Sequence, residues 1–239
     1  MAQLKPLNKN IDVLILAGGK GERLKSVISD KPKVLAEISG QTFIDLILKK
    51  LFSSGFEKVI ISVGYLKGKI IQHIKDNYPK SSIQFSEEDI PLGTGGAIKH
   101  ALKLIKTDPF LVLNGDSTIP INFNNFLNFH YESNSAVSMA VAKPREEKDY
   151  GALSLDSSNK VINYNEKAVG GGEFSNAGVY LINQKATAHF PEENAFSIEE
   201  DFFPKILNHG FYGFVCEGDL IDIGTPERLQ KAREILRND

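Results

Sequence analysis

The chain has 239 residues, of which 41% are hydrophobic and 24% are charged, and its formal net charge is −2. A chain of this length can bury a core that folds without disulfides or structural metals. The small net charge argues against a nucleic-acid or membrane partner recognised through bulk charge, and the single cysteine excludes an internal disulfide or a zinc site built on paired thiolates.

The first part of the chain alternates buried strands with amphipathic helices. Continuous apolar runs at 12–17, 59–63 and 110–114 predict strands covered on both faces. Apolar residues at helical spacing predict the helices between and after them, which we expect at 43–51, 70–74 and 97–105. This strand–helix–strand order indicates right-handed crossovers and a mainly parallel sheet.

The pattern changes after about residue 143. Short runs at 151–155, 160–164 and 177–182, separated by turn residues, predict antiparallel strands. Thr225 followed by Pro226 predicts the N-cap and first position of a final helix. The sequence therefore predicts a single α/β domain over residues 1–239, with a Rossmann-like, mainly parallel sheet flanked by helices and a small antiparallel insertion.

Membrane-spanning and secretory segments are not expected. No stretch approaches 18 consecutive apolar residues, and the first twelve residues lack the apolar core of a signal peptide. We therefore expect a reduced, cytoplasmic protein.

Three glycines, Gly18, Gly19 and Gly21, follow the first predicted strand, where α/β folds bind ligands. Glycine lets backbone N–H groups approach phosphate oxygens closely. The third glycine of a dinucleotide fingerprint is replaced by Leu24, and the chain has no Walker A sequence, so neither a nicotinamide cofactor nor a P-loop ATPase is supported. Residues 18–33 carry five basic and two acidic side chains, a balance that suits a polyphosphate.

The string "GGKGERL" at 18–24, followed by "PK" at 32–33, resembles the signature of the sugar nucleotidyltransferases. These enzymes make NDP-sugars from nucleoside triphosphates and sugar 1-phosphates. Later blocks resemble the same family, in order, over nearly the whole chain: "PLGTGGAIKHAL" (91–102), "LVLNGDS" (111–117), "NEKAVGGGEFSNAGVYLI" (165–182) and "LIDIGTPERLQKA" (220–232). Within the family, "RLKS", "PLGTGGAIK" and the "FS-x-EEDF" pattern are most similar to the short bacterial D-glycero-D-manno-heptose 1-phosphate guanylyltransferases.

The resemblance implies a Mg²⁺-assisted reaction in which a sugar 1-phosphate oxygen attacks the α-phosphorus of GTP and pyrophosphate leaves. Such chemistry needs positioning and neutralisation of charge more than a protein nucleophile. The product would be a GDP-heptose, a precursor of a lipopolysaccharide, capsule or S-layer glycan. The nucleotide-binding part is expected at about 10–142 and the sugar-binding part at about 143–239.

Residues matching the family motifs receive roles by resemblance. Arg23 would grip the β- and γ-phosphates and Lys33 the charge on the α-phosphate, because their cationic heads suit phosphate oxygens. Asp116 and Asp222 would hold the metal, as Mg²⁺ takes one or two carboxylates. Asp219 is a nearby alternative to Asp222, and either Asp116 or Asp222 could instead cap a turn.

The expected nucleotide contacts are Leu16, Ala17, Gly18, Gly19, Gly21, Glu88, Pro91, Gly93, Thr94 and Gly115. The expected sugar-phosphate contacts are Gly151, Glu166, Lys167 and Asn176.

Two details bear on the substrate. A carboxylate at Glu88 could accept both N1–H and N2–H of guanine, although Glu87 and Asp89 flank it. Glu22 places a negative charge in the phosphate loop, where the family usually has Thr or Ser. The stretch 196–207 resembles a family helix; its acidic residues 199–201 could touch the sugar, but a charged first helical turn explains them more simply.

Several alternatives stay open. Mannose 1-phosphate is the nearest rival sugar, and a uridylyl- or cytidylyltransferase belongs to the same family. An NDP-sugar-dependent glycosyltransferase would carry an Asp-x-Asp motif where this chain has "NGDS". A non-catalytic nucleotide-sugar-binding regulator would be expected to lack the cationic and acidic groups that are present here. Neither nucleic acid nor a membrane is an expected partner, and an assembly of identical chains stays open.

Overall fold

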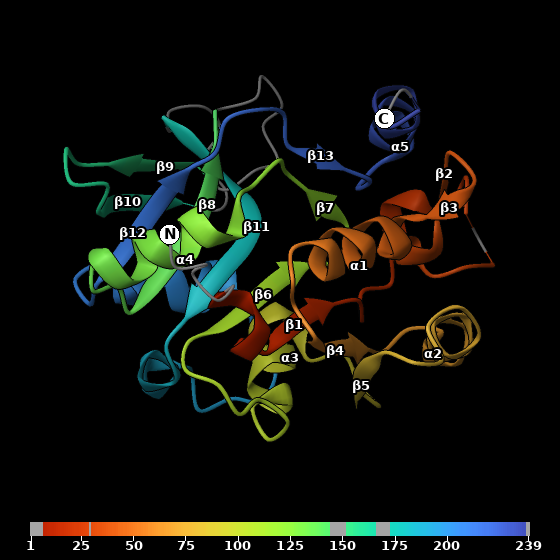
Figure 1. Cartoon of the computed structure of the whole chain (residues 1–239), viewed down its shortest axis with the longest axis horizontal. Coiled ribbons are helices and arrows are strands. Elements are labelled where there is room, and N and C mark those ends of the chain that lie inside the picture. The colour runs from red at the N-terminus through yellow and green to blue at the C-terminus, as the bar shows by residue number, and fades with distance from the viewer. Residues whose placement is uncertain (1–6, 29, 144–151, 166–172, 238–239) are drawn as a thin grey trace, which may run out of the picture.

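The computed structural model describes residues 7–28, 30–143, 152–165 and 173–237. Within them, nine strands form one mixed sheet in the order β10-β9-β11-β6-β1-β4-β5, with β8 beside β11 and β12 beside β8 (Figure 1). These strands are β1 Val13–Leu16, β4 Lys58–Val63, β5 Ser82–Glu87, β6 Phe110–Asn114, β8 Val137–Ala142, β9 Ala152–Leu155, β10 Val161–Asn165, β11 Phe174–Ile182 and β12 Phe211–Val215. Two small antiparallel pairs accompany the sheet: β2 Glu37–Ile38 with β3 Gln41–Thr42, and β7 Ser117–Thr118 with β13 Ile221–Asp222.

Strands β1, β4, β5 and β6 are parallel, as the alternation of strands and helices predicted. Leu16 at the end of β1 lies opposite Ser62 of β4 and Asn114 of β6, so these strands end at the same edge. The turns that follow them therefore meet at one edge of the sheet, where α/β folds bind ligands.

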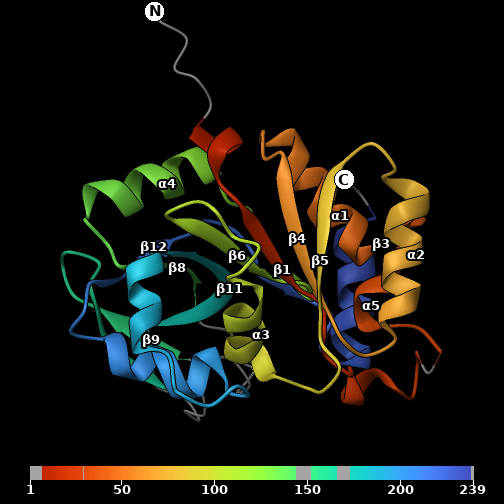
Figure 2. The same cartoon turned by 90° about the horizontal axis from the view of Figure 1, so that it is seen from below.

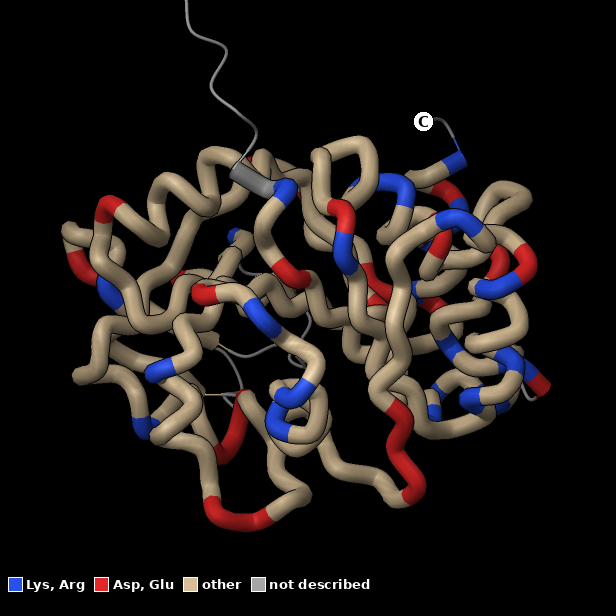
Figure 3. Tube along the Cα trace, turned by 60° about the horizontal axis from the view of Figure 1, so that its bottom comes forward, with Lys and Arg blue, Asp and Glu red and all other residues tan. Residues whose placement is uncertain are grey.

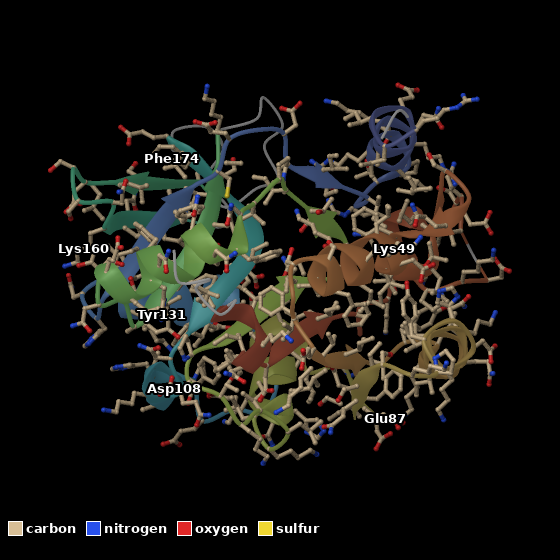
Figure 4. The ribbon with its side chains drawn as sticks, in the orientation of Figure 1. Lys49, Glu87, Asp108, Tyr131, Lys160 and Phe174 are labelled. Atoms are coloured by element: carbon tan, nitrogen blue, oxygen red, sulfur yellow. The ribbon has the colours of Figure 1, made fainter. Side chains whose placement is uncertain are left out.

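The antiparallel strands continue this same sheet. Strand β11 runs antiparallel to β8 on one side, and on its other side it pairs antiparallel with β9 at its start and with β6 at its end. In Figure 4, Lys160 and Phe174 mark this antiparallel half, whereas Lys49 and Glu87 mark the parallel half. The predicted fold class is thus confirmed, with the insertion joined to the central sheet by backbone hydrogen bonds.

Helices cover both faces of the sheet (Figure 2). One buried apolar cluster joins side chains of α1, α2, α4 and α5 to one face, and a second cluster joins α3 and the segment 196–206 to the other. The helices are α1 Phe43–Ser53, α2 Lys67–Asn77, α3 Gly93–Ala101, α4 Phe123–Glu132 and α5 Pro226–Ile235. Short 3-10 helices lie at Leu7–Asn10, Glu22–Leu24, Lys33–Leu35, Gln184–His189 and Phe203–Ile206, and a π-helical turn lies at Ile198–Phe202. Lys and Arg lie among Asp and Glu in both halves of the molecule, in keeping with the small net charge (Figure 3).

Two predicted helix boundaries can be compared with the structure. The N-cap prediction for α5 is confirmed, because the Thr225 hydroxyl accepts the backbone N–H of Arg228 and Pro226 occupies the first turn. The helix expected at 97–105 begins earlier, at Gly93, and ends at Ala101, since residues 102–104 turn away. None of the described helices has the length and hydropathy required to cross a membrane.

His130 on α4 is a buried histidine held in its neutral form. Its ring is 2% exposed, with Nδ1 2.8 Å from Ser138 Oγ and Nε2 3.0 Å from Asn183 Oδ1. Because the Asn183 amide nitrogen already donates to Ser135 O, Asn183 Oδ1 is the acceptor, so Nε2 carries the proton and Ser138 donates to Nδ1. Burial lowers the pKa of His130 below its usual value.

We expect this histidine to make the protein less stable in acid. The unfolded chain takes up a proton at His130 near pH 6.5, whereas the folded protein takes it up only at lower pH. The free energy of unfolding should therefore be highest above pH 6.5 and fall as the pH is lowered through that value. Urea unfolding at pH 7.5 and pH 5.5 measures the fall. His130→Gln should show a shallower fall, and an equally steep one would contradict the assignment.

Candidate active site

The glycine-rich loop after β1 folds back over Lys33. Gly21 has φ 59°, in the left-handed region that favours glycine, and a Cβ there would lie 3.2 Å from Lys33 Cβ. Leu24, 1% exposed, anchors the short helix that follows. On the same helix Arg23 is exposed, and Glu22 pairs with Lys25 at 2.7 Å, both side chains being largely exposed. The negative charge of Glu22 is therefore partly neutralised within the loop itself, by Lys25.

Lys33 lies against Asp116. It opens a short helix directly after Pro32, and the buried side chains of Val34 and Leu35 fix that helix on the core. Lys33 Nζ lies 2.6 Å from Asp116 Oδ2, and only 13% of the lysine side chain is exposed. An ammonium group in such a partly dehydrated position acts more strongly on a neighbouring charge than one in bulk water.

Asp116 and Asp222 are brought together by the small β7–β13 pair. Asp222 lies opposite Ser117, the residue after Asp116, and Ile223 donates its backbone N–H to Asp116 O at 3.0 Å. The Asp222 side chain is 8% exposed. Asp222 on β13 is thus brought next to Asp116, which lies 106 positions earlier in the sequence, in the turn just before β7. Asp219, the alternative to Asp222, lies in the preceding loop and is exposed.

Gly224 marks the point where this cluster converges. A Cβ at this position would lie 2.9 Å from Asp222 Oδ1, 3.5 Å from Arg228 Nη1 and 3.7 Å from Lys33 Nζ. The Gly224 N–H donates to Asp222 Oδ1 at 2.9 Å, and Arg228 Nη1 lies 3.5 Å from the same oxygen. The predicted Lys33, Asp116 and Asp222 therefore form one group of charges, joined by Arg228.

Arg228 is a site residue that the motif comparison missed. It lies in the first turn of α5, where the helix dipole disfavours a cation. A basic residue in that unfavourable position, six residues after a candidate metal ligand, was the signal available in the sequence.

The donor set fits a divalent cation such as Mg²⁺. Asp116, just before β7, and Asp222, on the paired strand β13, present hard carboxylate oxygens close to each other in the fold. Among the residues that the structure describes, no three side chains of His, Cys, Asp or Glu gather as a complete metal site. Two carboxylates that leave positions for water and phosphate oxygens are the usual arrangement for Mg²⁺.

Glu88 lies beneath the glycine-rich loop and is 8% exposed. Its Oε1 accepts from Ser62 Oγ at 2.7 Å and its Oε2 accepts from Leu92 N at 3.2 Å. A Cβ on Gly18 would lie 3.0 Å from Glu88 Oε1, so the carboxylate is next to the predicted nucleotide loop. Glu88 thus supports the 88–92 turn, and its reading of a guanine edge stays a prediction.

The remaining predicted nucleotide residues lie around the same edge. Leu16 ends β1, and Ala17 donates its N–H to Ser62 O at 2.9 Å. Gly115 donates its N–H to Leu16 O at 2.9 Å, and a Cβ there would lie 2.5 Å from that oxygen. Glycine at 115 therefore allows the ends of β1 and β6 to approach each other.

The glycines of "PLGTGG" pack against a distant segment of the chain. A Cβ on Gly93 would lie 2.5 Å from Phe196 O, one on Gly95 2.1 Å from the Phe196 ring, and one on Gly96 2.2 Å from Asn194 O. Sequence analysis counted Pro91, Gly93 and Thr94 of this stretch among the expected nucleotide contacts. The structure shows that one side of it is covered by residues 194–196, while Pro91 is exposed.

Gly96→Ala should therefore destabilise the protein, although alanine is the better helix former. The added methyl would meet a backbone carbonyl at 2.2 Å, and overpacking of this kind costs about 1–3 kcal/mol. Gly68→Ala in α2 is the matched control, since a Cβ there meets nothing within 4 Å, and it should stabilise by about 1 kcal/mol. Urea unfolding of both variants measures the difference, and shifts of the same sign would contradict this packing.

The predicted sugar-phosphate residues are described only in part. Gly151, Glu166 and Lys167 lie outside the described residues. Asn176 Nδ2 donates to Tyr180 Oη at 2.9 Å and Tyr164 Oη at 3.3 Å, and its Oδ1 accepts from Gly178 N at 2.9 Å. The amide of Asn176 is thus oriented by neighbours on β10 and β11.

Comparison with known proteins identifies the family. The family model described as nucleotidyl transferase matches residues 12–239. The D-glycero-alpha-D-manno-heptose 1-phosphate guanylyltransferase of Aneurinibacillus thermoaerophilus is 33% identical over 95% of this chain and 99% of its own length. The protein of the same name from Campylobacter jejuni is 34% identical over 91% of this chain and 96% of its own. HddC from Yersinia pseudotuberculosis, crystallised with GMP-PN, is 36% identical with a TM-score of 0.83, covering 95% of this chain and 99% of that one. The chain therefore belongs to the nucleotidyl transferase family.

Proposed function

We propose that the chain is a D-glycero-α-D-manno-heptose 1-phosphate guanylyltransferase, which converts GTP and the sugar phosphate into GDP-heptose and pyrophosphate with Mg²⁺. The observation that carries the proposal is the convergence of Lys33, Asp116 and Asp222 beside the glycine-rich loop. The two guanylyltransferase relatives of nearly the same length support the choice of substrates.

In this mechanism the chain's own groups position and neutralise phosphates. The backbone of Gly18, Gly19 and Gly21 approaches the triphosphate, and Arg23 binds the β- and γ-phosphates. Lys33 holds an α-phosphate oxygen and stabilises the negative charge that grows on it. A phosphate oxygen of the sugar forms the new bond to the α-phosphorus, the bond to the β-phosphate oxygen breaks, and pyrophosphate leaves with that electron pair.

Asp116 and Asp222 would hold Mg²⁺. A bound Mg²⁺ supplies positive charge that neutralises phosphate oxygens near the α-phosphorus. Arg228 lies beside Asp222 and orients its carboxylate. The nucleotide-binding part, about 10–142, contributes Lys33 and Asp116, and the sugar-binding part, about 143–239, contributes Asp222 together with Gly151, Glu166, Lys167 and Asn176.

The test is pyrophosphate release from each of GTP, ATP, UTP, CTP and dTTP with a panel of sugar 1-phosphates, with and without Mg²⁺. The panel contains the heptose phosphate in both anomers, mannose 1-phosphate and glucose 1-phosphate, and mass spectrometry identifies the product. We expect Mg²⁺-dependent formation of GDP-heptose from GTP. A preference for mannose 1-phosphate would replace heptose in the assigned substrate, and a preference for another triphosphate would replace guanine. No pyrophosphate release with any pair of substrates would contradict the proposal.

A further inference from the structure

The amino-terminal end of α3 is capped by a segment about 100 residues away. Its N-cap residue, Leu92, offers no side-chain cap, and the amides of Gly95 and Gly96 instead donate to Phe196 O at 3.0 and 3.2 Å. Phe196 N donates back to Leu92 O at 2.9 Å. Because unsatisfied N–H groups at a helix end are costly when buried, the position of the 92–96 turn depends on residues 194–198.

Side chains extend this connection. The Thr94 hydroxyl donates its only proton to Glu199 Oε2 at 2.5 Å, and Ser197 Oγ donates to the same oxygen at 2.9 Å. Thr94 Oγ1 also accepts the backbone N–H of Ile198 at 3.0 Å. With its proton directed at Glu199, Thr94 has no hydroxyl hydrogen to donate to a nucleotide.

Glu199 itself is almost fully buried. It is 9% exposed, unlike its neighbour Glu200, which is exposed. Burial is the main cause of a raised pKa at Glu199, and the negative charge of Asp116 raises it further. Glu199 lies in the acidic first turn of a helix, as the sequence predicted, but unlike Glu200 it is enclosed by the protein.

We propose that Thr94, Ser197 and Glu199 form a latch that holds the nucleotide-binding turn 88–96 in place, with Glu199 as a positioning residue. The inference rests on the proposed function, because it assigns the latched turn to the nucleotide. The latch ties a turn of the nucleotide-binding part to a segment of the sugar-binding part. Its loss leaves the cluster of Lys33, Asp116 and Asp222 intact but lets the turn leave its binding position, so nucleotide affinity falls and the chemical step changes little.

The first test compares Glu199→Ala, Thr94→Val and the double variant with wild type. Affinity for a non-hydrolysable GTP analogue with Mg²⁺ is measured by titration calorimetry, and kcat and both KM values are measured in the full reaction. We expect each single variant to weaken analogue binding about tenfold, kcat to fall less than threefold, and the double variant to be no weaker than either single one. Thr94→Ser restores the hydroxyl and should recover most of the affinity, and Glu200→Gln should match wild type.

Different outcomes overturn the latch. Additive losses in the double variant would show that Glu199 and Thr94 act independently. A raised KM for the sugar phosphate with unchanged analogue binding would make Glu199 a sugar contact. Lower thermal stability with unchanged analogue binding would reduce the three residues to a structural role.

The second test does not depend on the reaction. Hydrogen exchange of peptides covering residues 92–98 should be markedly faster in Glu199→Ala and Thr94→Val than in wild type, and unchanged in Glu200→Gln. Unchanged exchange in the first two variants would overturn the latch whatever the substrate. If wild type bound no nucleoside triphosphate at all, the proposed function would fail, whereas the exchange result would still decide whether the latch holds the turn.

Discussion

Lys33→Ala is expected to lower turnover at least about a hundredfold, the usual loss when one preorganised electrostatic contact to the reacting group is removed. The ammonium of Lys33 lies 2.6 Å from Asp116 Oδ2 and is largely buried. In the proposed reaction, a water molecule that took its place would not supply the same positive charge to the α-phosphate. Because negative charge grows on the α-phosphate during the proposed reaction, kcat should fall more than KM for GTP rises. Steady-state kinetics with pyrophosphate detection measures both constants.

Lys31→Ala is the matched control for this change. Lys31 lies two residues earlier, with its side chain 46% exposed and paired with Glu37 at 3.1 Å. A surface pair of this kind contributes little, so the variant should keep normal kinetics. Near-normal turnover in Lys33→Ala, or equal losses in both variants, would contradict the role proposed for Lys33.

Asp222→Asn should also lower turnover at least about a hundredfold and raise the Mg²⁺ concentration needed for half-maximal rate. Asparagine keeps the oxygen that accepts Gly224 N–H, so the turn should keep its shape, but it removes the charge that Mg²⁺ prefers. Binding of Mn²⁺ in the presence of a GTP analogue, followed by electron paramagnetic resonance, measures the metal site without turnover.

Asp219→Asn separates the two candidate aspartates. Asp219 is exposed in the loop before β13, whereas Asp222 is buried beside Ser117 and Arg228. The Asp219 variant should bind Mn²⁺ and turn over as wild type does. Loss of Mn²⁺ binding in Asp219→Asn together with normal binding in Asp222→Asn would reverse the assignment.

In the parallel half, the strands that sequence analysis identified are those covered on both faces; in the antiparallel half it identified β9, β10 and β11 but missed the buried β8. Continuous apolar runs correspond to β1, β4 and β6, whose residues are nearly all buried. Strand β5 escaped notice because it lies at the edge of the sheet and alternates apolar with polar residues, as "SIQFSE" shows. The third helix was extended too far, since Leu102 and Ile105 continue its apolar spacing after the helix itself has ended at Ala101.

The candidate site was predictable where local motifs carry it. Lys33, Asp116 and Asp222 each stand in a recognisable block, and the ends of parallel strands bring such blocks together. Contacts between blocks were not predictable. The glycines of "GTGG" suggest room for a ligand, but only the structure shows Phe196 and Asn194 packed against them. Glu199 reads as one of three consecutive acids, and only burial distinguishes it from Glu200.

The β7–β13 pair has a consequence for synthesis on the ribosome. Lys33 and Asp116 emerge early, but the strand that brings Asp222 to Ser117 emerges more than a hundred residues later. Domains fold as units during elongation, so a nascent chain that has not yet released residues 221–224 holds the ammonium and one carboxylate without the other. The proposed site is therefore completed in a single late step, when the β7–β13 pair forms.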